Sequence, residues 1–169
     1  MKLTSLLLPA VLTATVSARS PWLNGNQVSV QDATDVPGEN PLLFCSDAST
    51  DILEIDSIDL DPNPPQAGHT LDIKATGILK KDVEEGAQIY LQVKYGLITL
   101  INQKRDLCDQ VKSVDLECPL KKGPLELTKS VELPKQIPPG KYHVMADVLT
   151  KDGDKITCIY ADVSFNVGG

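Results

Sequence analysis

The sequence predicts an all-β protein, an immunoglobulin-like antiparallel β-sandwich of about seven strands. Apolar and polar residues alternate with a period of two in five separate segments of the chain. Clusters of Gly, Pro, Asn and Asp stand between these segments, and no long stretch shows helical periodicity. Short alternating strands separated by turn signals are typical of a sandwich, and the length fits a single domain.

The chain opens with the features of a secretory signal peptide. Lys2 gives a positive start, the stretch that follows up to Val16 is mainly apolar, and the small residues ending at Ala18 form a cleavage site. The apolar stretch is too short to span a bilayer. We therefore assign residues 1–18 to a signal peptide that is removed in the secretory pathway.

The next segment, residues 19–40, is polar and contains scattered Gly, Pro and Asn. It is either a pro-segment that is removed or a frayed N-terminal arm, and both interpretations stay open. The folded domain is assigned to residues 41–169.

Strands are predicted where the alternation is regular. The five segments are LDIKATGIL (71–79), IYLQVKYGL (89–97), LELTKSVEL (125–133), YHVMADVLT (142–150) and TCIYADVSFNV (157–167). A sixth, DILEIDSIDL (51–60), alternates less regularly, which indicates a β-bulge. Turn signals separate the strands, and Asp152-Gly153 predicts a tight hairpin between the last two.

Alternation fails in YGLITLI (95–101), where apolar residues point to both faces. One explanation is a central strand that is buried on both faces. The other is an apolar rim beside the mouth of a cavity. Leu133 and Ile137 also stand among prolines in an expected loop, and two exposed apolar stretches in one small domain indicate a candidate site.

The cysteine pattern indicates two disulfides. An exported chain matures under oxidising conditions, and this one has an even number of cysteines: Cys45, Cys108, Cys118 and Cys158. The residues alone leave three possible pairings. No C-x2-C spacing is present, and His69 and His143 lie far apart, so we expect no metal site.

Charge and motifs exclude several functions. The formal net charge of −7 repels nucleic acid, and no strongly basic membrane-binding run is present. The sequence has no G-x-S-x-G, no H-E-x-x-H and no phosphate-binding glycine loop. We therefore expect a monomeric protein that is not an enzyme and needs no cofactor.

Three motifs carry a family resemblance: FCSD with DIL near the start, C-x9-CP in the middle, and ITCIYADVSF at the end. With LP and IPPGKY, they make the chain similar to the ML lipid-recognition domain family over about residues 42–167. Within that family it resembles the fungal phosphatidylglycerol/phosphatidylinositol transfer proteins, which are relatives of the lysosomal sterol carrier lost in Niemann-Pick type C disease. Animal sterol carriers have a third, short-range disulfide where this chain has DLDPNPPQAGH, a departure that favours the fungal branch.

The resemblance implies a sandwich whose two sheets part to hold a lipid. It implies disulfides Cys45–Cys158 and Cys108–Cys118. It also implies binding and intermembrane transfer of phosphatidylglycerol and phosphatidylinositol, with transient contact at a membrane surface. Sterol binding and transport is the near alternative, and a secreted protein-interaction module without lipid cargo is the alternative of another class.

Candidate site residues follow from this interpretation. We expect the lipid to contact the inward faces of the central strands and the proline-rich loop: Leu91, Val93, Tyr95, Leu97, Leu100, Ile101, Leu133, Ile137, Tyr142, Val144 and Ala146. The disulfide Cys108–Cys118 would close a loop, and the basic residues on either side of this loop are candidates for contact with the head group or a membrane: Lys104, Arg105, Lys121 and Lys122. The expected location is the vacuolar or endosomal lumen or the extracellular space.

Overall fold

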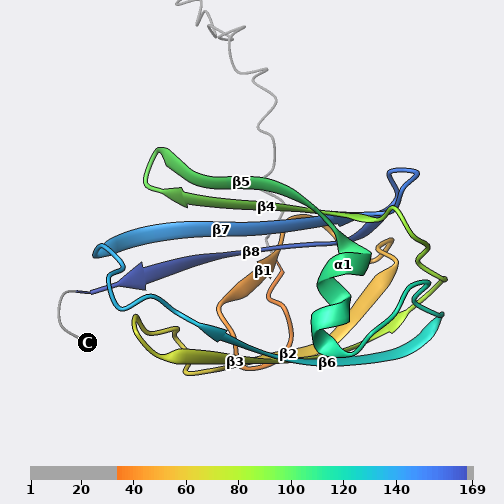
Figure 1. Ribbon diagram of the computed structural model, residues 1–169, viewed down its shortest axis with the longest axis horizontal. Coiled ribbons are helices and arrows are strands. Elements are labelled where there is room, and N and C mark those ends of the chain that lie inside the picture. The colour runs from red at the N-terminus through yellow and green to blue at the C-terminus, as the bar shows by residue number, and fades with distance from the viewer. Residues whose placement is uncertain (1–33, 167–169) are drawn as a thin grey trace, which may run out of the picture.

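The computed structural model describes residues 34–166, and the predicted signal peptide and most of the predicted arm lie outside this range. As predicted, two antiparallel sheets pack as a sandwich (Figure 1). One sheet has the order β1-β8-β7-β4-β5 and the other β2-β3-β6. The strands are β1 (Leu42–Phe44), β2 (Leu53–Asp61), β3 (Thr70–Leu79), β4 (Gln88–Tyr95), β5 (Ile98–Asp106), β6 (Gly123–Glu132), β7 (Gly140–Leu149) and β8 (Lys155–Phe165).

Two local predictions about the strands are confirmed. The register between β2 and β3 shifts between Ile55 and Ser57, which is the bulge expected from the irregular alternation there. The β7–β8 hairpin turns at Asp152-Gly153, where Gly153 has a φ of +89°, a conformation that favours glycine.

The position of β5 decides between the two explanations for YGLITLI. β5 pairs only with β4 and forms the edge of its sheet, so the interpretation as a central strand is wrong. A two-residue turn at Gly96-Leu97 joins the strands, and the side chains of Leu97, Ile98 and Leu100 are 101%, 61% and 54% exposed. The apolar residues therefore form an exposed hairpin tip.

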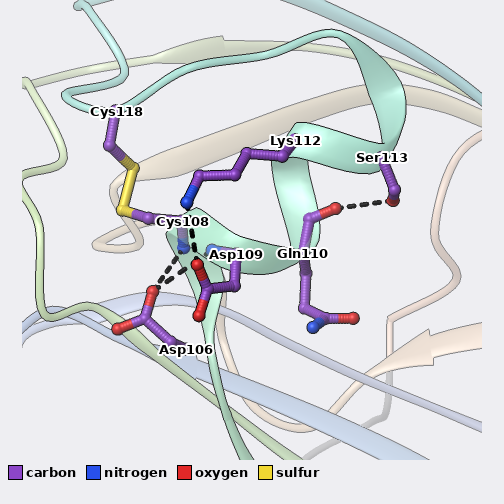
Figure 2. Close-up of polar contacts among 7 residues, drawn as sticks. All are labelled: Asp106, Cys108, Asp109, Gln110, Lys112, Ser113 and Cys118. Carbon is purple, nitrogen blue, oxygen red and sulfur yellow. Dashed lines mark hydrogen bonds and ion pairs between the residues drawn. A yellow bond between two sulfur atoms is a disulfide. The ribbon is translucent and has the colours of Figure 1, made fainter.

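A short helical segment after β5 was not predicted. It consists of α1 (Leu107–Val111) and the 3-10 turn η1 (Lys112–Val114). The Asp106 carboxylate accepts hydrogen bonds from the backbone N–H groups of Cys108 and Asp109 and so caps α1 (Figure 2). Lys112 pairs with Asp109 across one turn.

Both disulfides implied by the resemblance are confirmed. Cys108 and Cys118 close the helical segment onto the loop that follows it (Figure 2). Cys45, just after β1, is bonded to Cys158 in β8. The two bridges have very different loop lengths, with 10 and 113 residues separating the paired positions.

The two ends of the sandwich differ in packing. A solid core fills the end near α1, and its buried members are Ile52, Leu79, Val83, Ala87, Leu107, Leu120 and Ile156. The β4–β5 hairpin tip and the β6–β7 loop (133–139) lie at the opposite end (Figure 1). Within residues 34–166, no helix is long and apolar enough to cross a bilayer.

Candidate functional site

An apolar cavity of about 620 Å³ lies between the sheets. Both sheets and the β6–β7 loop contribute to its wall. The lining residues are Pro41, Leu42, Ile58, Leu60, Pro65, Leu71, Ile73, Val93, Leu100, Ile101, Leu133, Pro134, Gln136, Ile137, Pro138, Tyr142, Val144, Ile159, Ala161, Val163 and Phe165. Only Gln136 and Tyr142 carry a polar side-chain group, so the wall offers almost no partners for water.

The same strands that build the solid core also build the cavity. In β4, Ile89 packs against the core, and Val93, four residues later on the same face, lines the cavity. In β7, Val148 packs against the core and Val144 lines the cavity. Both strands therefore run from the filled end to the hollow end, so the core holds them in register while the cavity stays open.

A bulge in β5 brings two consecutive residues to the cavity. Val93 pairs with Ile101 and Lys94 pairs with Thr99, which leaves Leu100 as the extra residue. Consecutive residues of a regular strand point to opposite faces. Because the bulge breaks that rule, Leu100 and Ile101 both line the cavity.

Two tyrosines hold the loop that closes one side of the cavity. The Tyr142 hydroxyl donates to the carbonyl oxygen of Pro138 at 2.8 Å, and the Tyr95 hydroxyl donates to that of Pro139 at 3.0 Å. Burial raises the pKa of the Tyr142 hydroxyl, with a smaller contribution from Tyr95, so the group stays protonated and able to donate. The rings lie 5.1 Å apart.

Glycine is required where this loop enters β7. Gly140 has a φ of +145°, and a Cβ atom there would lie 2.5 Å from Cε2 of Tyr95. Because Gly140 has no side chain, the Tyr95 ring can pack against its backbone while the hydroxyl reaches the carbonyl oxygen of Pro139.

The predicted lipid-contact residues divide into two groups. Seven line the cavity: Val93, Leu100, Ile101, Leu133, Ile137, Tyr142 and Val144. Four do not: Leu91, Tyr95, Leu97 and Ala146. Leu91 and Ala146 pair with each other nearer the solid end, Tyr95 supports the loop from outside the lining, and Leu97 is fully exposed at the hairpin tip.

The four predicted basic residues lie away from the cavity lining. Lys104 is three residues beyond Ile101 along β5, or about 10 Å, and its Nζ lies over the ring of Tyr90. The side chain of Arg105 donates to Gln103, and that of Lys121 is paired with Asp82. Lys121 and Lys122 directly follow Leu120, which belongs to the solid core. Their role toward a head group or membrane remains a prediction.

The predicted lipid contacts include none of the lining residues from the three-stranded sheet or from β8. Ile58, Leu60, Leu71 and Ile73 come from the former, and Ile159, Ala161, Val163 and Phe165 from the latter. The alternation in residues 71–79 and 157–167 places six of these residues on the apolar faces of their strands. Alternation does not indicate which part of each strand borders a cavity.

Within residues 34–166, no group of three or more His, Cys, Asp or Glu side chains is arranged to hold a metal ion. His143 instead pairs with Asp162 at 2.8 Å on neighbouring strands. The cavity wall can bind an apolar molecule by exclusion of water, and it presents no reactive group.

Curated relatives resemble this chain over most of its length. A phosphatidylglycerol/phosphatidylinositol transfer protein of Aspergillus fumigatus is 59% identical, with 89% of this chain and 88% of the relative covered. A protein of the same name from Neurospora crassa is 54% identical, with 92% and 89% covered. Both are named as transfer proteins.

Solved structures share the fold at low sequence identity. Chicken MD-1 complexed with lipid IVa superposes with a TM-score of 0.51 and 21% identity, covering 73% of this chain and 91% of that one. A Niemann-Pick type C2 protein from Japanese carpenter ant gives a TM-score of 0.50 and 17% identity, covering 73% and 97%. The ML domain family model matches residues 39–165. This match covers most of the chain and confirms the resemblance seen in its motifs: the protein belongs to the ML domain family.

Proposed function

We propose that this protein binds a phospholipid with its acyl chains in the apolar cavity and transfers it between membranes. The observation that carries the proposal is the cavity itself, because about 620 Å³ lies within the range of about 300–1,000 Å³ usual for ligand sites. That volume could hold roughly 20 water molecules, but the wall would offer almost no hydrogen-bond partners to those in contact with it. An apolar ligand fits this wall better than water does.

The energetics of lipid exchange require a cavity of this kind. Two acyl chains with ~30 methylenes in total would cost on the order of 20 kcal/mol to expose to water. Polar contacts cannot supply that amount, since non-covalent affinities saturate near it. A carrier must therefore replace one apolar environment by another. The lipid then partitions between bilayer and protein without covalent chemistry, which fits a protein that is not an enzyme.

The names of the relatives support the choice of cargo. Relatives at 59% and 54% identity are named for transfer of phosphatidylglycerol and phosphatidylinositol, and we propose the same cargo here. Sterol transport is the alternative, and identification of the bound lipid would distinguish the two.

The hairpin tip supports direct contact with the membrane. Leu97 is fully exposed, Ile98 and Leu100 are more than half exposed, and Leu100 also lines the cavity. The tip lies at the same end of the sandwich as the β6–β7 loop (Figure 1). An apolar tip that is continuous with the cavity wall would enter the bilayer surface and open a dry path for the acyl chains.

Both disulfides and the predicted signal peptide support function in the secretory pathway or outside the cell. The vacuolar or endosomal lumen and the extracellular space are the compartments that we propose.

Organic extraction of the native protein, followed by mass spectrometry, tests the cargo. We expect phosphatidylglycerol or phosphatidylinositol at up to one lipid per protein. A fluorescence assay with donor and acceptor vesicles should then show transfer of these lipids in proportion to protein concentration. Recovery of sterol alone would show that the cargo is a sterol and not a phospholipid. A lipid-free protein that transfers no lipid would favour the alternative of a protein-interaction module.

A further inference from the structure

A polar groove adjoins the apolar cavity. It has a volume of about 460 Å³, and Gly68, His69, Thr70, Glu132, Leu133, Pro134 and Lys135 line it. Leu133 and Pro134 also line the apolar cavity, so the two spaces share one wall. A large apolar space next to a smaller polar one matches the two parts of a phospholipid.

Backbone hydrogen bonds make this wall a fixed structure. The N–H of Leu133 donates to the carbonyl oxygen of His69 at 3.0 Å, and the N–H of Gly68 donates to that of Pro134 at 3.1 Å. These bonds tie the segment before β3 to the segment after β6. The polar side chains of the groove therefore keep a defined position relative to the cavity.

Within residues 34–166, Lys135 is the one lysine or arginine that lies between two chain neighbours that both line the cavity. Its two neighbours, Pro134 and Gln136, both line the cavity. Its side chain packs over Gly68, where a Cβ atom would lie 2.9 Å from Cγ of Lys135. Within residues 34–166 it has no ion-pair partner, whereas Lys121 is paired with Asp82. An unpaired ammonium at a cavity border is suited to a phosphate group.

Two hydrogen-bond acceptors share the groove with this cation. Glu132 has no ion-pair partner in the described part of the chain, and its carboxylate can accept from hydroxyl groups. Nδ1 of His69 lies 3.2 Å from the carbonyl oxygen of Ala67, which can only accept. The proton of a neutral ring is therefore on Nδ1, and Nε2 is left as an acceptor.

Building on the proposed function, we infer that this groove binds a phosphodiester that carries a polyhydroxylated head group. Lys135 takes the phosphate, and Glu132 and His69 accept hydrogen bonds from the polyol hydroxyls. Glycerol and inositol head groups both combine one phosphodiester charge with several hydroxyl donors. The groove residues, rather than the four basic residues near the Cys108–Cys118 loop, then contact the head group.

Short-chain lipids test the inference without a membrane surface. The probes are dihexanoyl phosphatidylglycerol and dihexanoyl phosphatidylmethanol, both monomeric in solution, and free glycerophosphoglycerol. The two lipids have equal charge and differ in their hydroxyl groups. Isothermal titration calorimetry would measure each affinity for the parent protein and for Lys135→Gln and Glu132→Ala. Lys74→Gln is the control, since Lys74 is exposed on the same sheet, about 13 Å along β3 from Thr70.

The phosphate contact predicts that Lys135→Gln lowers the affinity for both lipids about fivefold and that Lys74→Gln leaves both affinities unchanged. The hydroxyl contacts predict that the parent prefers phosphatidylglycerol to phosphatidylmethanol and that Glu132→Ala removes most of this preference. If Lys135→Gln binds both lipids as tightly as the parent protein does, Lys135 does not contact the phosphate. If Glu132→Ala keeps the preference for phosphatidylglycerol, Glu132 does not contact the hydroxyl groups. In either case, binding of both lipids would leave the proposed lipid-carrier function standing.

Free glycerophosphoglycerol separates a lipid head group from a soluble phosphodiester. It lacks acyl chains, so we expect no binding at concentrations that saturate the protein with the dihexanoyl lipid. Binding as strong as that of the lipid would overturn the assignment of the groove to a lipid. Failure of every lipid to bind the parent protein would instead contradict the proposed function.

Discussion

The hydroxyl group of Tyr142 donates a hydrogen bond to the carbonyl oxygen of Pro138, 2.8 Å away, and both residues line the apolar cavity. Pro138 belongs to the loop that forms one side of the cavity, whereas Tyr142 lies in β7. The bond therefore links a rigid strand to the part of the wall that has no regular structure.

Removing this hydroxyl should loosen the loop and speed lipid exchange. Tyr142→Phe keeps the ring and deletes the donor, so the cavity keeps its shape while the loop opens more readily. We expect dissociation of bound lipid to become about fivefold faster, the factor that one ordinary hydrogen bond contributes. Stopped-flow fluorescence with a labelled phospholipid measures this rate. Tyr90→Phe is the control, because Tyr90 is 39% exposed and does not line the cavity. Equal rates in both variants and the parent would contradict the idea.

A larger side chain at Val144 should block the cavity without unfolding the protein. Val144 pairs with Ala161 across β7 and β8, and both residues line the cavity. In Val144→Phe the ring has open space to occupy, so we expect the melting temperature to stay close to that of the parent while lipid binding falls at least tenfold. Calorimetry and a lipid-binding titration measure the two quantities.

Ala146→Phe, two residues along the same face, is the matched comparison. Ala146 does not line the cavity, and its neighbours across the sheet are Leu91 and Ile159. Overpacking there should destabilise the fold by about 1–3 kcal/mol. If Val144→Phe were the less stable of the two and still bound lipid, the cavity would not be the binding site.

The sequence predicted the strands well because alternation reports which residues face inward. The five regular segments correspond to β3, β4, β6, β7 and β8, and the irregular one corresponds to β2 with its bulge. The disulfides were predicted by the family resemblance and not by the residues alone, since four cysteines allow three pairings.

Features that depend on the neighbours of a strand could not be predicted. β5 is at the edge of its sheet, and the apolar run within it is equally compatible with a central strand. α1 has only five residues, too few to show a period, although Asp106 before it is a capping signal. The hollow end of the sandwich is set by the spacing of the two sheets. Alternation does not report this spacing. The prediction that Ala146 lines the cavity was therefore wrong.

Polar substitution at the hairpin tip should slow transfer from membranes and leave binding intact. Leu97 is 101% exposed, so Leu97→Asn removes no contact from the folded protein. If its side chain enters the bilayer, losing it should weaken vesicle association about tenfold, as expected for burial of one leucine. Vesicle sedimentation and the transfer assay measure the effect, and titration with a short-chain lipid checks binding. Ile78→Asn is the control, as Ile78 is 44% exposed on β3. Equal losses in both variants would contradict a specific role for the tip.

The two disulfides should differ in their contribution to stability. In the loop-entropy model, a bridge that closes 10 residues contributes about 3 kcal/mol and one that closes 113 residues contributes about 5 kcal/mol. We therefore expect Cys45→Ala/Cys158→Ala to lower the free energy of unfolding more than Cys108→Ala/Cys118→Ala. Urea denaturation of the two double variants measures both values. A larger loss from the short bridge would show that the Cys108–Cys118 loop contributes native-state contacts beyond the effect on the unfolded chain.

Asp51 should make the protein more stable as the pH falls. Asp51 is only 3% exposed, and burial raises the pKa of its carboxyl group, an effect that nearby Lys155 and Lys80 oppose and Asp147 reinforces. A carboxyl group whose pKa is higher in the folded than in the unfolded state destabilises the fold at neutral pH. The destabilisation is relieved as the pH falls through the raised pKa toward the unfolded value of 3.8. Asp51→Asn should therefore be more stable than the parent at pH 7, and this advantage should shrink toward pH 4.

Asp47, four residues earlier, should show the opposite pH dependence, and its charge also contributes to the raised pKa of Asp51. Its carboxylate accepts a hydrogen bond from the backbone N–H of Ser49 at 2.9 Å, which lowers the pKa of Asp47. The ionised form of Asp47 therefore stabilises the fold above pH 3.8, and this contribution is lost as the pH falls through the lowered pKa. Asp47→Asn should be less stable than the parent at pH 7, with the difference fading in acid. Urea denaturation of the parent and both variants from pH 7 to pH 3 measures the two trends, and a loss of stability in Asp51→Asn at pH 7 would show that the ionised carboxylate of Asp51 stabilises the folded state.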